Sequence, residues 1–179
     1  MCLFINEQDG KAPEFVKNPE DITAYAIRIK NPDGSIESPL NTLTWLKGVV
    51  EYLPSDEGYL RELLLIRHFD NIGGQYINND GEIVNITKET GFGEYVLTKG
   101  IFHLFKHKSD AEHLMQAWGK QNEEELASSG LVLVLCEYII PAGAMVIEGH
   151  TMFMETGHCE DRYESYGTTA AMLSSIIAE

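Results

Sequence analysis

The sequence predicts a single α+β domain, residues 1–179, with a largely antiparallel or mixed sheet and two to four helices. Three observations support this fold class. Segments with strand-like alternation outnumber helix-like segments, and hairpin turn signals dominate the connections between them. No linker, internal repeat or low-complexity segment divides the chain of 179 residues, which is long enough to bury a substantial core.

The first elements are a polar segment and a strand. Residues 7–21 contain two prolines and many polar side chains, and they predict a loop or extended arm that is either packed or ordered by a partner. Residues 22–30 predict a strand because apolar side chains recur at every second position from Tyr25 to Ile29. The Asn-Pro-Asp-Gly sequence at 31–34 predicts a tight turn after that strand.

The next part of the chain mixes signals. Residues 39–52 have apolar side chains at helical spacing, but Gly48 weakens a helix, so the segment stays ambiguous. Ser55, followed by acids, predicts the start of a helix that ends near Asp70. The Asn-Asp-Gly sequence at 79–81 predicts a hairpin between two short strands.

A strand, a turn and a helix follow. Residues 100–105 predict the strand. Ser109 and Glu112 have the spacing of a capping box, and an apolar stripe then predicts a helix through Ala111, Leu114, Met115 and Trp118. Residues 122–129 either continue this helix past Gly119 or begin a second one.

Strand signals return in the last part of the chain. Residues 131–140 form an apolar run that predicts a strand, broken by the Pro-Ala-Gly sequence at 141–143. Residues 149–159 predict another strand and turn, and residues 163–169 one more short strand. Residues 169–177 predict a closing helix or a less ordered tail.

The formal charge of −15 restricts the classes of partner. Phosphate backbones repel so acidic a chain, so general nucleic-acid binding is disfavoured, whereas a basic protein partner is compatible with it. The basic side chains that gather in one short segment are interpreted as a solvated strand edge: Lys99, Lys106, Lys108, His103 and His107.

The chain carries no signal for a membrane or for an oxidising compartment. No apolar run reaches the ~18–20 residues of a membrane-spanning helix, and the N-terminal residues lack the basic region of a secretory signal. Three widely spaced cysteines do not make a disulfide framework. We therefore expect a cytoplasmic protein without a membrane partner, and the sequence leaves its oligomeric state open.

Catalytic and metal-site motifs are absent from the sequence, including the phosphate-binding glycine loop and the His-Glu-x-x-His motif. The remaining metal candidates are His150, His158 and Cys159, whose imidazole and thiolate groups suit zinc or another transition metal. They are close in sequence, and neighbouring residues rarely converge on one ion. No cofactor is predicted from the residues themselves.

Two segments carry a resemblance to known proteins. Residues 100–112 read Gly-Ile-Phe-His-Leu-Phe-Lys-His-Lys-Ser-Asp-Ala-Glu, and residues 133–143 end in Ile-Ile-Pro-Ala-Gly. With the Met-Cys-Leu-Phe start and Tyr25 on an early strand, the chain resembles an uncharacterised family of small bacterial and phage-borne proteins. Its members show a glycine-aromatic-histidine segment, a helix, and an Ile-Pro-x-Gly strand. The resemblance covers the order of elements over most of the chain and implies no known activity.

The order of elements is also similar, more distantly, to the ADP-ribosyltransferase-like fold. That resemblance implies that Arg28 faces the nicotinamide nucleotide of NAD, with Glu160 or Glu164 as the late catalytic acid. It also predicts that Arg28, His103 and one of these glutamates converge on one cleft. The sequence departs from the family because it lacks the Ser-Thr-Ser middle motif. The alternative for Arg28 is a strand residue that faces solvent.

Two functions follow as expectations. The first is a small, acidic, non-enzymatic binding or accessory protein of bacterial or phage origin that acts through a protein partner. The second is an ADP-ribosyltransferase-like NAD-binding domain, with or without activity. A concentration of acids on one face of the folded protein would favour the first.

Overall fold

Strands dominate the first part of the chain. The computed structural model describes residues 3–5, 13–38, 43–56, 59–60, 75–77, 83–85, 95–97, 100–152 and 162–178. The strands up to residue 105 are β1 (Leu3–Ile5), β2 (Val16–Lys17), β3 (Ile22–Lys30), β4 (Ile36–Glu37), β5 (Thr44–Trp45), β6 (Val50–Tyr52), β7 (Gln75–Ile77), β8 (Ile83–Asn85), β9 (Tyr95–Leu97) and β10 (Phe102–Phe105).

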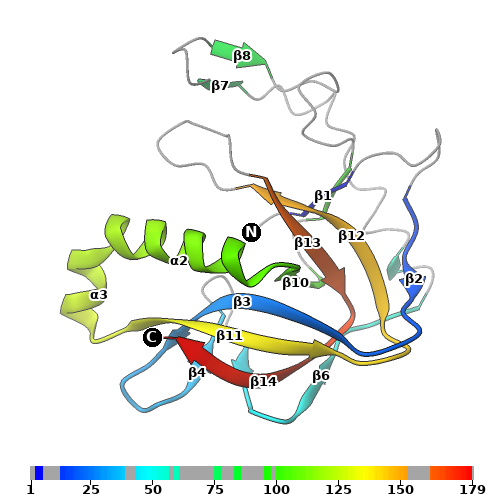
Figure 1. Cartoon of the computed structure of the whole chain (residues 1–179), viewed down its shortest axis with the longest axis horizontal. Coiled ribbons are helices and arrows are strands. Elements are labelled where there is room, and N and C mark those ends of the chain that lie inside the picture. The colour runs from blue at the N-terminus through cyan, green and yellow to red at the C-terminus, as the bar shows by residue number, and fades with distance from the viewer. Residues whose placement is uncertain are drawn as a thin grey trace.

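Two helices and four longer strands complete the described chain (Figure 1). They are α2 (Lys108–Gln121), α3 (Glu123–Ser129), β11 (Val132–Ile140), β12 (Met145–Met152), β13 (Arg162–Thr168) and β14 (Ala170–Ala178). Neither of the helices in the described ranges is long and apolar enough to cross a membrane.

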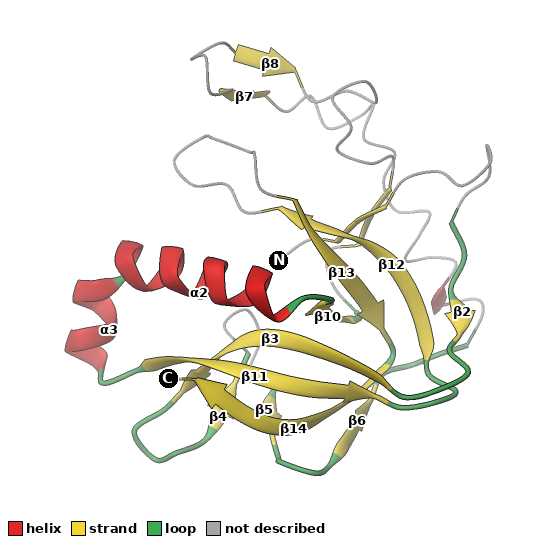
Figure 2. Ribbon diagram, in the orientation of Figure 1, coloured by secondary structure: helices red, strands yellow, loops and turns green. Residues whose placement is uncertain are grey.

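One sheet joins nearly all the described strands (Figure 2). Its hydrogen-bonded order is β6-β14-β11-β3-β10-β13-β12-β1-β9, with β2 beside β12 and with β4 and β5 attached through β3. Strands β7 and β8 pair with each other in a separate hairpin. Every pairing among the described strands is antiparallel, so the predicted α+β class is confirmed in a strand-rich form.

The β3–β11 pair forms the centre of the sheet. It keeps one register over its whole length, from Ile22 opposite Ile140 to Lys30 opposite Val132. Because successive side chains of a strand point to opposite faces, the pair presents two distinct surfaces. We call the surface that contacts helix α2 the α2 side, and the opposite surface the Trp45 side.

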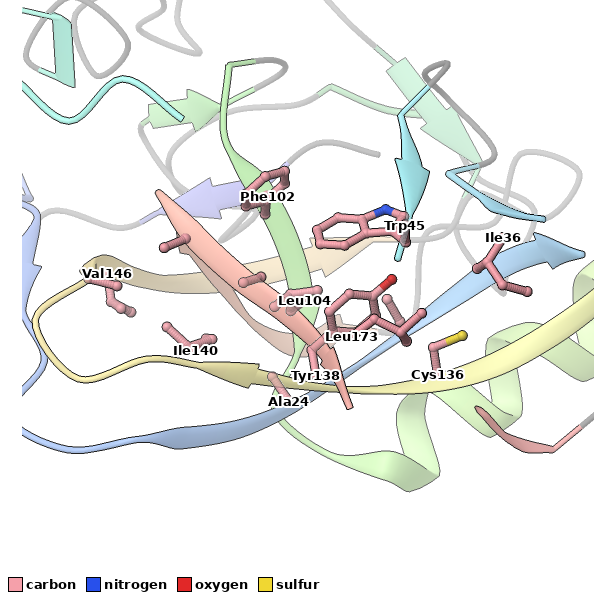
Figure 3. Packing of buried hydrophobic residues seen from close by; sticks show 14 of the residues in the cluster. Ala24, Ile36, Trp45, Phe102, Leu104, Cys136, Tyr138, Ile140, Val146 and Leu173 are labelled. Carbon is pink, nitrogen blue, oxygen red and sulfur yellow. The ribbon is translucent and has the colours of Figure 1, made fainter. Parts of the chain in front are cut away.

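The Trp45 side holds the largest apolar cluster (Figure 3). Alternate residues of β11, among them Cys136 and Tyr138, are fully buried there. Strands β4 and β5 fold over this surface, and the centroid of the Trp45 ring lies 4.7 Å from that of Tyr138 and 5.0 Å from that of Phe102. The chain then continues into β6, which pairs with the start of β14 and closes the cover.

The α2 side is covered by the first half of helix α2. Ala111 and Leu114 are buried against Ile27 and Leu135 of the central strands, while Met115 and Trp118 are half-buried at the margin of the same cluster. The predicted apolar stripe is therefore confirmed. The capping box is not, because α2 begins at Lys108 without a side-chain cap, and the Ser109 hydroxyl donates instead to Asp110.

The prediction of a helix over 169–177 is wrong. These residues form β14, which pairs with β11 on one side and with β6 on the other. The spacing of the small and apolar residues fits either period, and burial of Ala171 and Leu173 against the Trp45-side cluster favours the strand. Tertiary pairing thus overrides a local helix signal.

The ambiguous segment 39–52 contains β5 and β6, with a turn at Gly48, whose φ of 76° is in the left-handed region. The structure describes two other predicted segments only in part, the arm 7–21 and the helix that starts at Ser55. In the predicted arm 7–21, Asn18 is buried and its backbone pairs with Ala144 and Gly143. Most of the helix predicted to end near Asp70 lies outside the described residues.

Candidate functional site

The corner between α2 and α3 forms the candidate site. Asn122 separates the two helices, because its φ of −117° and ψ of 21° are not helical. Its backbone N–H and its side-chain amide both donate to the carbonyl oxygen of Trp118, at 3.1 and 2.9 Å. The predicted alternative of a second helix is confirmed. None of the α3 residues is buried, so α3 projects from the sheet instead of packing on it.

A groove lies between this corner and the adjacent ends of β3 and β11. Its volume is about 430 Å³. The side chains that line it come from four segments of the chain: Ile29, Trp118, Gln121, Asn122, Glu125, Leu126, Leu131 and Leu133. The five apolar members of this set are half-buried. The floor of the groove is therefore apolar and accessible.

Carboxylates flank the groove. Glu125 lines it, and among the described residues no lysine or arginine does. A wider, open hollow shares Gln121, Asn122 and Glu125 with the groove. It adds Glu123 and Glu124, and Lys120 is the one basic side chain that lines it in the part of the chain that the structure describes. The three glutamates occupy the first turn of α3, where their negative charges also stabilise the helix by interacting favourably with its dipole. The site combines an apolar floor with a negatively charged margin.

Arg28 lies elsewhere, inside the Trp45-side cluster. Its side chain is 5% exposed, so the interpretation as a solvent-facing strand residue is wrong. The Nε group donates to the hydroxyl of Tyr138 at 2.8 Å, and Nη1 donates to the carbonyl of Ile27 at 3.0 Å. The guanidinium carbon is 5.3 Å from the centroid of Trp45 and 4.9 Å from that of Tyr138, which gives two cation–π contacts.

His103 lies on the α2 side of the sheet. It alternates on β10 with Phe102 and Leu104, which belong to the Trp45-side cluster, so its side chain points the other way. Both ring nitrogens are buried and have no hydrogen-bond partner among the described residues. Burial, with nearby positive charge that includes Arg28, lowers the pKa of His103 to about 3. Arg28 and His103 therefore project from opposite faces of the sheet and do not meet in one cleft.

The glutamates proposed as a late acid have different positions. Glu164 lies on β13 and is exposed. Its Oε2 atom lies 3.1 Å from Nε2 of His107. Two ion pairs involve the residues on either side of His107: Lys106 contacts Glu148 at 2.7 Å, and Lys108 contacts Glu112 at 3.0 Å. Glu160 lies outside the described residues.

The metal candidates are only partly described. His150 lies on β12, opposite Glu164 in the register with β13, while His158 and Cys159 lie outside the described residues. Within the described ranges, no group of three or more histidine, cysteine, aspartate or glutamate side chains is arranged to hold a metal ion. Metal binding by the three candidates stays a prediction.

Sequence reasoning did not find the groove, because it treated Trp118 as the last member of a buried stripe. The available signal was the run after it. Three glutamates and then Leu126 follow Asn122, and this pattern does not continue the stripe that buries Ala111 and Leu114. A short helix that begins with three glutamates and carries one large apolar residue, Leu126, predicts an exposed element.

Comparison of the chain with family models, with curated proteins and with solved structures gave no match.

Proposed function

We propose that this protein is a non-enzymatic binding protein that takes a basic, amphipathic segment of a partner protein in the groove between α3 and the β3–β11 pair. The observation that carries the proposal is the accessible apolar floor beside Trp118, with Glu125 at its margin and Glu123 and Glu124 next to it. An apolar floor selects aliphatic or aromatic side chains, and the carboxylates select lysine and arginine around them.

The apolar floor would supply most of the affinity. Removing apolar surface from water contributes about 25 cal/mol per Å², from which the entropic costs of association are subtracted. Tryptophan is enriched among the few interface residues that dominate binding energy. Trp118 packs against the cluster that contains Leu135 and also lines the groove. It therefore offers a rigid aromatic wall to an entering side chain.

The charge would supply selectivity and a fast encounter. A net charge of −15 attracts cationic partners over long distances and repels acidic ones. Each exposed carboxylate adds little affinity by itself, about 0.2–1 kcal/mol. The carboxylates at the margin of the groove would therefore determine which class of partner binds, while the apolar floor would supply most of the binding free energy.

A labelled peptide of lysine and leucine, with its leucines spaced to form one apolar face, tests the floor. Fluorescence anisotropy measures its dissociation constant. We expect Leu126→Asp to weaken binding about tenfold or more, equivalent to about 1.4 kcal/mol, although the new carboxylate itself attracts the peptide. Val16→Asp is the control for charge, because it makes the same change in charge at an exposed apolar residue that does not line the groove; its effect should stay within about twofold.

The acidic margin is tested with the same peptide at low ionic strength. Replacing Glu123 and Glu124 by glutamine should weaken binding about threefold to tenfold. Replacing the exposed Glu14 and Glu20 by glutamine makes the same change in net charge far from the groove and should have a smaller effect. Equal effects of the two pairs, or equal binding of a lysine peptide without leucine, would contradict a specific groove.

A further inference from the structure

Beyond the end of β6, no strand among the described residues pairs with the outer edge of β14. Strand β6 pairs only with Ala170, Ala171 and Met172, and the backbone N–H of Gly48 donates to the carbonyl of Leu173. From residue 174 to residue 178, β14 has one strand neighbour within the described chain, β11. The backbone groups on its other edge are therefore available to pair with an added strand.

The open edge carries no charged residue or proline, and its pairing with β11 shifts register at Ser174 and at Ile177. The sequence of β14 is Ala-Ala-Met-Leu-Ser-Ser-Ile-Ile-Ala, without a charged residue or a proline. Natural edge strands are commonly shielded by lysine, proline or an inward-pointing charge. Ile176 and Ile177 are 40% and 36% exposed. An uncharged, apolar edge in so acidic a chain indicates a surface that is covered in use.

We infer that this edge, residues 174–178, accepts an extended segment of a basic partner protein as an additional strand of the sheet. Strand addition supplies affinity through main-chain hydrogen bonds and selectivity through alternate side chains. The two exposed isoleucines would contact apolar residues of the added strand.

Charge selects the partner over a second copy of this chain. Two copies would each bring a charge of −15 to the contact, whereas a lysine-rich segment brings the opposite charge. The carboxylate of Glu137 lies one strand inward, on β11, opposite Ser175, and accepts a hydrogen bond from Ser174 at 3.2 Å.

The edge lies at the same end of the molecule as α3 (Figure 1). Ala178 of β14 and Leu133, which lines the groove, pack against the same apolar cluster. The inference goes beyond the groove and does not depend on it, because the edge uses main-chain pairing and the groove uses side-chain burial. One partner could nevertheless occupy both.

Amide hydrogen exchange tests the inference, with a short peptide in which lysine and valine alternate as the probe. The expected result is that the peptide slows exchange of the outward N–H groups of residues 174–178 by about tenfold or more. The same peptide with N-methyl groups along one edge cannot donate to the sheet, and it should give no protection.

Matched variants separate strand pairing from general attraction. Ile177→Lys places a positive charge on the edge and should abolish protection, whereas Val16→Lys makes the same charge change on another exposed apolar residue and should leave it intact. Leu126→Asp should not affect this test, so failure of the groove and failure of the edge are distinguishable. Protection by the N-methylated peptide, protection that survives Ile177→Lys, or self-association through the edge in light scattering would each overturn the inference.

Discussion

The two tryptophans of the chain occupy opposite faces of the same pair of strands and have opposite surroundings. Trp45 is 3% exposed and is enclosed by Phe102, Tyr138 and the guanidinium of Arg28. Trp118 is half-buried, with one margin against the α2-side cluster and the other in the groove. The aromatic ring of the first completes a closed core, while that of the second is left available to another molecule.

The difference comes from what covers each face. On the Trp45 side, β4, β5 and β6 extend across the strands and return to the sheet at β14. On the α2 side, the helix that covers the sheet ends at Gln121, and α3 turns away without a buried residue. On the Trp45 side, the covering strands return to the sheet and enclose a core. On the α2 side, the covering helix ends before the end of the strands and leaves a groove.

The largest expected effect distinguishes the two tryptophans directly. Trp45→Ala should lower the free energy of unfolding by about 4 kcal/mol, because it leaves a large cavity inside a closed cluster. Trp118→Ala should cost about 1 kcal/mol, since Trp118 is only half-buried and lies at the margin of its cluster. Urea unfolding followed by circular dichroism measures both. Similar losses for the two variants would mean that the groove is part of the core.

Removing the buried cation tests the closed face more narrowly. Arg28→Ala should lower the free energy of unfolding by about 3 kcal/mol, because it removes the hydrogen bond to Tyr138 and both cation–π contacts. Arg28→Met keeps most of the side-chain volume and should cost less. The same denaturation experiment gives the comparison. A loss below about 1 kcal/mol for the alanine variant would contradict a structural role for the buried guanidinium.

The smallest effect concerns His103 and depends on pH. The pKa of His103 in the folded protein, about 3, lies below the ordinary value of 6.5. Between these values the unfolded chain binds more protons, so the stabilisation present above pH 6.5 falls as the pH drops toward 3. The loss is at most about 1.4 kcal/mol per pH unit. Stability measured from about pH 7 to about pH 5 should fall less in His103→Leu than in the unmodified protein.

His107→Gln is the control for this experiment. His107 is exposed and contacts Glu164, so its replacement changes the histidine count without removing a buried imidazole. Its pH profile should follow that of the unmodified protein. Identical profiles for His103→Leu and the unmodified protein would show that the His103 imidazole reaches water in the folded state.

The sequence predicted elements whose signal is local. The strands predicted over 22–30 and 131–140 are confirmed. Their apolar residues favour a buried strand whichever strands pair with them, so the local sequence is enough to predict them. Two short strands flank the Asn-Asp-Gly sequence at 79–81, and they pair as predicted. The segment 169–177 was mispredicted because its small and apolar residues fit either period, and only pairing with β11 and β6 decides between them.

The candidate site could not be predicted in the same way. The groove exists because Ile29, Trp118 and Leu133 come together from distant parts of the chain, and no local pattern encodes that meeting. Arg28 shows the converse error. One charged residue in a strand predicts exposure, but the rings of Trp45 and Tyr138 beside the guanidinium and a hydroxyl at hydrogen-bonding distance make burial possible.

Cys136 gives the closed face a chemical consequence. Its thiol is fully buried beneath the cover that Trp45 completes, and burial raises its pKa to about 11. The reactive thiolate is therefore scarce at neutral pH, and an alkylating reagent reaches the sulfur only while the sheet is open. The rate of alkylation at this cysteine, distinguished from the other two by peptide mass, therefore reports how often the core opens.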